Sequence, residues 1–337
     1  MKKSSAKILV SNIIKSLLLP VIVYLIFVIL TGGKFGTAAT MVTMLRNACQ
    51  SIILAWGTML VVATGMWDFS AGAQLYLSAL IAIPIITSLN MNPVGMILVL
   101  LVISLLMRVA VAVIYQVVHV KSMVTTLALA MIFESISKYV FGSGLTFQVK
   151  SCLAIANAPW CFVIVAVMAV FTIVIWKYTK FAYHVRALST GENVARGIGL
   201  NPGRIRFFVF LVEGVFLALA TALMLATRGF ILPPTNLSSN TLVFNALMAV
   251  FIGQALERYS NRVIGVAIGT IVMTMLNSGL LAMGVNSAWQ VTVTGVFMAL
   301  FIGFSTNQQR VYQYFDDRRR AREISAKYGI AVKAEKR

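Results

Sequence analysis

Long apolar stretches recur along this chain and are separated by short polar segments. Each stretch holds about 20 residues, the length that an α-helix needs to cross the hydrocarbon core of a bilayer. The pattern predicts an all-α polytopic membrane protein with about ten transmembrane helices. The predicted spans cover residues 13–31, 48–65, 70–87, 94–116, 122–141, 158–177, 207–227, 241–256, 262–281 and 287–306.

The connection between the second and third spans is too short for an ordinary loop. It holds the sequence GMWD at 65–68, and Phe69 and Ser70 follow directly. It is either a tight turn or a helix broken at membrane depth, which is tolerated where the backbone is buried or lines a cavity. Asp68 would mark a substrate or ion path if it lies inside the membrane, or it caps the start of the next helix.

Composition supports the membrane class. Of 337 residues, 60% are hydrophobic and 11% are charged, with a mean hydropathy of +0.91, whereas a soluble domain carries about 25% charged residues. The chain has two isolated histidines and three cysteines without a CxxC motif, so we expect no metal site. Cys152 and Cys161 could share an external loop and form a disulfide, or remain unpaired.

The net charge of +19 is concentrated in two segments, with six Lys/Arg from Lys177 to Arg206 and nine from Arg310 to Arg337. Ten spans that start from a cytoplasmic N-terminus place both segments in the cytoplasm, as the positive-inside rule requires. The charge therefore indicates topology and not nucleic-acid binding. We expect a transmembrane permease domain at 1–306, whose first span is not cleaved as a signal peptide, and a basic cytoplasmic tail at 307–337.

The cytoplasmic loop at about 178–206 contains the sequence RALSTGENVARGIGLNPGRIRFF, which predicts a short helix bounded by turns. Gly191 precedes Glu192, a residue favoured at a helix N-terminus, and Gly199 closes the segment. The apolar side chains of Val194, Ile198 and Leu200 would dock into a groove on a partner, or rest on the membrane surface.

Several charges fall inside predicted spans. Glu134 and Lys138 are spaced i, i+4 and could pair on one helix face, and Arg108 could extend its head group towards the cytoplasm. With Asp68 and Glu213, these groups leave open an alternative function, an ion-coupled secondary transporter that uses intramembrane carboxylates.

Four segments, in order, resemble the permease subunits of bacterial ATP-binding-cassette (ABC) importers for ribose and related sugars, in the superfamily of branched-chain amino acid permeases. Residues 44–73 are similar to the second span and its GGIDLSVGS-like turn, and 123–144 to the TLGTM segment. Residues 187–210 are similar to the loop written A-x-G-x-N-x-x-A-A-x-x-x-G-I, and 262–290 to the span with GTLIGAL and LNNGL elements. The Gly-rich loop of the family is replaced here by IGQALERYSNR at 252–262.

The resemblance implies a dimeric membrane domain in the bacterial inner membrane, formed with a second copy or a related permease and surrounded by lipid. It implies no cofactor, two ABC ATPase subunits, and an extracytoplasmic binding protein that delivers a small polar solute, most often a sugar. The chain has no GxxxxGK[ST] loop, so we expect the partners to hydrolyse ATP. The implied ATPase-coupling residues are Gly191, Glu192, Asn193, Ala195 and Gly199, and the candidate pathway or gating residues are Asp68, Phe69, Ser70, Glu134 and Asn277.

Overall fold

The computed structural model describes residues 2–257, 259–286, 289–290, 292–297, 299–300 and 303, with the backbone alone for 2–14. The chain divides into two units, Met1–Ser287 and Ala288–Arg337. The first unit is helical apart from one short β-ribbon. Its elements are α1 (Lys2–Leu30), η1 (Lys34–Gly36), α2 (Ala38–Val62), α3 (Ser70–Ser88), α4 (Pro93–Val118), α5 (Ser122–Phe141), β1 (Leu145–Thr146), α6 (Lys150–Leu153), η2 (Ala154–Ala156), α7 (Trp160–Tyr178), α8 (Lys180–Ser189), α9 (Glu192–Gly197), α10 (Pro202–Arg228), β2 (Phe230–Ile231), α11 (Asn240–Leu256) and α12 (Arg262–Ala282).

A helix overlaps each of the first nine predicted spans, so the all-α membrane class is confirmed. Within the described residues, seven helices are long and apolar enough to cross a membrane, namely α2, α3, α4, α5, α7, α10 and α12. The apolar part of α1 (Lys15–Leu30) and α11 are shorter. In the tenth predicted span, 287–306, residues 289–290, 292–297, 299–300 and 303 are helical, and the other nine residues lie outside the described part of the chain.

Helix α2 begins ten residues before the predicted start at 48. The predicted span boundary left Arg46 in the preceding external loop. In the structure the Arg46 Nε donates a hydrogen bond of 2.9 Å to the carbonyl oxygen of Ala156. A polar side chain that finds a partner in this way can be accommodated inside a helix, so the helix continues past it.

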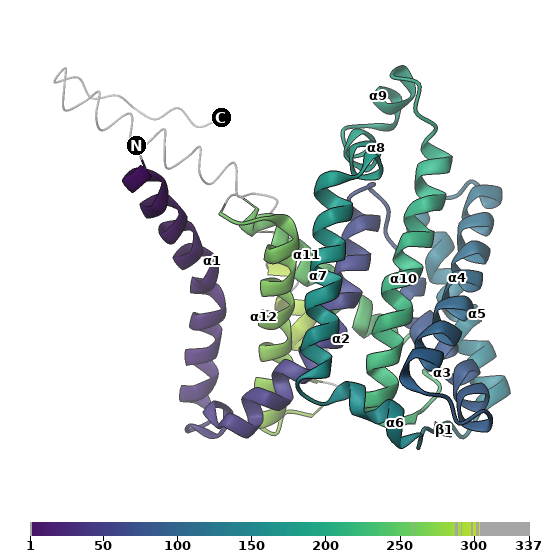
Figure 1. Ribbon diagram of the computed structural model, residues 1–337, viewed down its shortest axis with the longest axis horizontal. Helices are drawn as coiled ribbons and strands as arrows, with labels where there is room; N and C mark the ends of the chain where they lie inside the picture. Colours follow the sequence, from purple (N-terminus) through teal and green to yellow (C-terminus); the bar gives the residue numbers. More distant parts are fainter. Residues whose placement is uncertain are drawn as a thin grey trace. The chain divides into compact units, whose positions relative to one another are not determined.

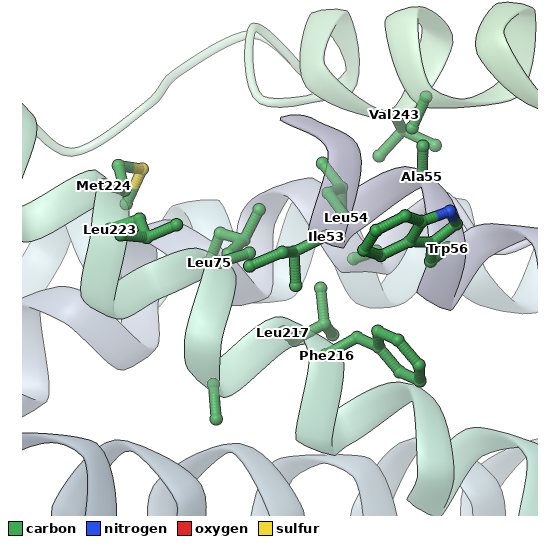
Figure 2. Packing of buried hydrophobic residues seen from close by; sticks show 14 of the residues in the cluster. Ile53, Leu54, Ala55, Trp56, Leu75, Phe216, Leu217, Leu223, Met224 and Val243 are labelled. Carbon is green, nitrogen blue, oxygen red and sulfur yellow. The ribbon is translucent and has the colours of Figure 1, made fainter. Parts of the chain in front are cut away.

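The centre of the first unit consists of α2, α3 and α10. The apolar window of each is 72% buried, against 28% for α4 and 22% for α7, whose outer faces remain apolar and exposed. Figure 2 shows Ile53 and Trp56 of α2 packed near Leu75 of α3 and Phe216 of α10. The Trp56 Nε1 also donates 2.9 Å to the carbonyl of Val263, which joins α12 to this core.

Glycines bring α11 and α12 into close backbone contact. A Cβ built on Gly269 would lie 2.5 Å from the carbonyl oxygen of Ala249, and one on Gly265 would lie 2.8 Å from that of Gly253. Small residues four positions apart permit this kind of approach between membrane helices. The pair therefore packs along its backbones.

The two ends of the first unit carry different structures (Figure 1). Helices α8 and α9 lie at one end, called here the α9 end, and α6 and β1 lie at the opposite end, the β1 end. The antiparallel ribbon pairs Leu145 with Ile231 and joins the segments that follow α5 and α10. Near it, the possible disulfide is absent, because Cys152 and Cys161 are both buried free thiols.

Candidate coupling and gating sites

Helix α9 forms where the sequence predicts a short helix, and its ends are set by glycines. Gly191 precedes it with a φ of 143°, and Gly199 follows it with a φ of 80°. The N–H of Leu200 donates 3.0 Å to the carbonyl of Ala195, and the N–H of Gly199 donates 3.0 Å to that of Arg196. This pair of bonds is the Schellman motif, in which glycine permits the left-handed residue that ends a helix. The sequence therefore fixes both limits of α9 locally.

Glu192 fastens α9 to the start of α10. Its carboxylate accepts hydrogen bonds from Arg196 at 2.7 Å and from Arg206 at 2.8 Å. The hydrogen bonds from Arg196 and then Arg206 hold the pKa of Glu192 below its usual range. The carboxylate is 37% exposed, so each pair is screened by solvent and stabilises the loop only modestly.

One face of α9 is buried and the other is apolar and exposed. Ala195 is fully buried, whereas Val194 is 55% and Ile198 is 64% exposed. Asn193 is exposed as well. Exposed β-branched apolar side chains on a short, rigid helix are suited to a groove on another protein.

A polar groove of about 630 Å³ lies beside α9, between the C-terminal end of α4 and the start of α10. Tyr115, Gln116 and His119 line one side, and Glu192 and Arg206 line the other. The Gln116 Nε2 donates 3.0 Å to the carbonyl of Gly203. This bond ties the end of α4 to the start of α10.

The chain between α2 and α3, called here the 63–69 turn, is a break of seven non-helical residues. Asp68 is 1% exposed, and its Oδ1 accepts the Ser70 N–H at 2.8 Å and the Ser70 hydroxyl at 2.6 Å. The Asp68 carboxylate thus accepts the N–H of the first residue of α3, although the N-cap position itself is occupied by Phe69, which makes no side-chain cap bond. Helix α5 holds the turn from the other side, because the hydroxyl of Thr126 accepts the Phe69 N–H at 3.1 Å.

Asp68 also belongs to an ionic group that sequence reasoning missed, called here the buried charge cluster: Asp68, Arg108 and Glu213. Arg108 pairs with Asp68 and with Glu213, the latter at 3.3 Å, and all three side chains are 0% exposed. The expectation that Arg108 extends towards the membrane surface is wrong. Two carboxylates lie within reach of the guanidinium inside the protein, which is a better environment than lipid for a charge.

The predicted pair of Glu134 and Lys138 is also wrong. The Glu134 carboxylate accepts the backbone N–H of Leu237 at 2.8 Å and that of Ser239 at 3.0 Å, while the Lys138 Nζ donates 3.2 Å to the carbonyl of Gly142. In this segment, 235–239, Asn236 and Leu237 have positive φ angles of 55° and 58°, and the N–H groups of Leu237 and Ser239 are the two that face the carboxylate. Glu134 therefore anchors the segment that precedes α11.

The remaining predicted positions are separate from these groups. Asn277 is half-buried on α12. In the segment that replaces the Gly-rich loop, Gly253 packs against Val266, and Glu257 forms an ion pair of 3.4 Å with Arg262. Arg258 lies outside the described residues.

Comparison with known proteins decides the family. Residues 40–302 match the family described as the permease component of branched-chain amino acid transport systems. The chain belongs to this family. It is a multi-pass membrane transport subunit, as the ordered motifs indicated.

Relatives align with most of the chain. The galactose/methyl galactoside import permease protein of Escherichia coli (strain K12) is 26% identical over 310 residues, which cover 85% of this chain and 91% of the relative. The ribose import permease protein of the same strain is 24% identical, covering 87% and 93%. The fructose import permease protein of Bifidobacterium longum (strain NCC 2705) is 22% identical, covering 75% and 73%. No solved structure matches.

Proposed function

We propose that this chain is the transmembrane permease subunit of an ABC importer and that it moves a sugar across the bacterial inner membrane. Separate ATPase subunits dock on α9 from the cytoplasm, and an extracytoplasmic binding protein delivers the cargo at the β1 end. The membrane domain is completed by a second copy or a related permease. The cargo class rests on the relatives, several of which are import permeases for sugars.

The observation that carries the proposal is the form of α9. It is a six-residue helix that is bounded by glycines, ended by a Schellman motif and fastened to α10 through Glu192, and it exposes Val194 and the adjoining Ile198. Two exposed apolar side chains at a short helix held by an ion pair fit a groove on a partner protein, and the proposal takes this role over that of a connector resting on the membrane surface. ATP-driven movement requires a partner that binds the two states of the permease differently. Helix α9 would be the surface on which that partner binds.

Gating is assigned to two regions in this proposal. Asp68, Phe69 and Ser70 lie buried in or beside the 63–69 turn, next to the start of α5, and Glu134 holds the 235–239 segment at the β1 end. Asn277 is kept as a candidate on α12. Rearrangement of the turn and of the segment would open the pathway alternately to each side, with weak contacts to the cargo.

A pull-down from gently solubilised membranes tests the docking role. We expect an ATPase subunit to copurify with the wild-type chain and to be lost from Ile198→Asp, because a carboxylate then faces the partner's groove. Glu192→Arg, which places a third cation beside Arg196 and Arg206, should release it as well. The matched control is Leu89→Asp, an apolar residue of similar exposure (63%) at the C-terminal end of α3.

The same preparations, reconstituted with the binding protein, should take up a sugar only when ATP is supplied. Copurification that is equal for Ile198→Asp and wild type would remove α9 as the docking site. If no ATPase is retained by the wild type and uptake instead follows an ion gradient, the chain is a secondary transporter.

A further inference from the structure

We propose that Arg108 and Glu213 are positioning residues that transmit the displacement of α9 to the 63–69 turn. The inference deepens the proposed function and rests on it, since it concerns how ATPase docking reaches the transport pathway. It gives the buried charge cluster a mechanical role instead of a contact with cargo.

The first link is between α9 and α10. Arg206 of α10 holds Glu192, the first residue of α9, at 2.8 Å, and four residues separate the two helices. A force on α9 therefore acts on the start of α10 through a side-chain ion pair as well as through the backbone.

The second link runs along α10. Glu213 follows Arg206 by seven residues, about two helical turns, so both side chains leave α10 on the same face and lie about 10 Å apart along its axis. Arg206 is at the α9 end of this helix, whereas Glu213 is fully buried among the spans. The helix is a rigid connection over this distance.

The third link crosses from α10 to the turn. Glu213 pairs with Arg108 of α4, and Arg108 pairs with Asp68, whose carboxylate accepts the N–H of Ser70 at the start of α3. Glycines close the surrounding space. A Cβ on Gly214 would lie 3.0 Å from Cγ of Arg108, and one on Gly57 would lie 3.3 Å from Cγ of Glu213. Close packing of this kind means that α10 cannot shift without moving Arg108 or breaking the ion pair.

The cluster also has the capacity for a second arrangement. The Nε and Nη2 of Arg108 are buried without a hydrogen-bond partner among the described protein atoms, while the Oε2 of Glu213 is engaged by the Nη1 of Arg108. An ionic group kept only for stability would be expected to be fully satisfied, since apolar residues of similar volume often serve stability equally well. Two unused donors on Arg108 suit an element that exchanges partners between two states, and a two-state element is what the coupling of distant sites needs.

The test uses the complete transporter, reconstituted in proteoliposomes with its ATPase subunits and binding protein. Uptake and ATP hydrolysis are measured in the same vesicles for Glu213→Gln, Glu192→Gln and the double variant. The control is Glu257→Gln, which removes a carboxylate and an ion pair (3.4 Å to Arg262) from outside the cluster. Arg108→Lys is a second probe, because lysine keeps the charge but lacks the planar guanidinium whose N–H groups reach two carboxylates at once.

We expect Glu213→Gln to retain the ATPase and to lower the solute moved per ATP by about 5-fold or more, the usual lower range of coupling between sites. Arg108→Lys should do the same, and Glu257→Gln should not. Because Glu192 and Glu213 would act in series, the double variant should lose less than about 2-fold beyond the stronger single variant. A residue that only stabilises the fold would lower the yield of assembled complex and leave the ratio unchanged.

An unchanged ratio in Glu213→Gln and Arg108→Lys, or losses that multiply in the double variant, would overturn the inference while leaving ABC import intact. If Glu213→Gln does not assemble, the ratio in Arg108→Lys decides in the same way. Failure of the wild-type chain to retain any ATPase is a different result, since it removes the proposed function and this inference together.

Discussion

Replacing Glu134 by glutamine tests whether this carboxylate anchors the segment before α11 or carries protons across the membrane. The side chain is 4% exposed and accepts two backbone N–H groups, from Leu237 at 2.8 Å and from Ser239 at 3.0 Å. Glutamine has nearly the same shape but only one acceptor oxygen. Its NH₂ group would face one of the two N–H donors, so that one hydrogen bond is lost and the other becomes neutral.

The expected loss follows from these two bonds. A hydrogen bond to a charged group contributes about 1.5–3 kcal/mol and a neutral one about 0.5–1.5 kcal/mol. Losing the first bond and weakening the second therefore costs about 2–4 kcal/mol of local stability. Since about 1.4 kcal/mol corresponds to a factor of ten, opening of the 235–239 segment should increase at least 10-fold.

Amide hydrogen exchange of the purified chain in detergent measures this opening. We expect the amides of Leu237 and Ser239 to exchange at least about 10-fold faster in Glu134→Gln, while those in the middle of α10 keep their rates. Lys138→Met is the matched control, because Lys138 lies beside the same segment but its Nζ donates to the carbonyl of Gly142. Unchanged exchange in the segment would refute the anchoring role.

Uptake assays separate the two functions of Glu134 further. If the residue anchors the segment, the Gln variant should retain ATP-dependent uptake at a reduced rate. Loss of ion-gradient-driven uptake, with normal exchange in 235–239, would instead favour the secondary transporter.

Three further predictions concern packing and pH. Gly72→Ala places a Cβ 2.3 Å from the carbonyl oxygen of Ser239. It should lower the free energy of unfolding by about 1–3 kcal/mol and so lower the thermal midpoint measured in detergent. Gly65→Ala is the control, because its Cβ meets no neighbouring atom and the variant tests only the positive φ. Trp56→Phe removes the donor to Val263 and should cost about 1 kcal/mol in the same assay. The arginine partners of Glu192 lower its pKa. The stability that the ionised group contributes is therefore present above its ordinary pKa and is lost as the pH falls through the lowered value. Limited proteolysis of α9 should show a stable loop at pH 6 and faster cleavage only well below about pH 4.

The helices and α9 could be predicted from the sequence because their signals are local. Apolar length gives a span, and the glycines at 191 and 199 are positioned where the ends of a short helix need them. The same reasoning failed for the start of α2, because Arg46 finds its acceptor, Ala156, 110 residues away.

The contacts of the intramembrane charges could not be predicted. The i, i+4 rule paired Glu134 with Lys138, but the acceptor capacity of Glu134 is used by N–H groups 103 and 105 residues further along the chain. Arg108 was visible as a charge in an apolar span, yet nothing local indicates that Asp68 and Glu213 meet it. Such contacts depend on the crossing of helices, which hydropathy does not encode.

The buried charge cluster also bears on how the chain enters the bilayer during synthesis. A chain is made from its N-terminus, and a lone arginine inside an apolar segment is costly to insert. Asp68 precedes Arg108 by 40 residues, so a carboxylate is already in place when the segment that becomes α4 leaves the ribosome. Glu213 arrives later, when the guanidinium is already positioned to receive it. The order of the three charges along the chain therefore makes one carboxylate available to Arg108 before its own segment is synthesised and a second one afterwards.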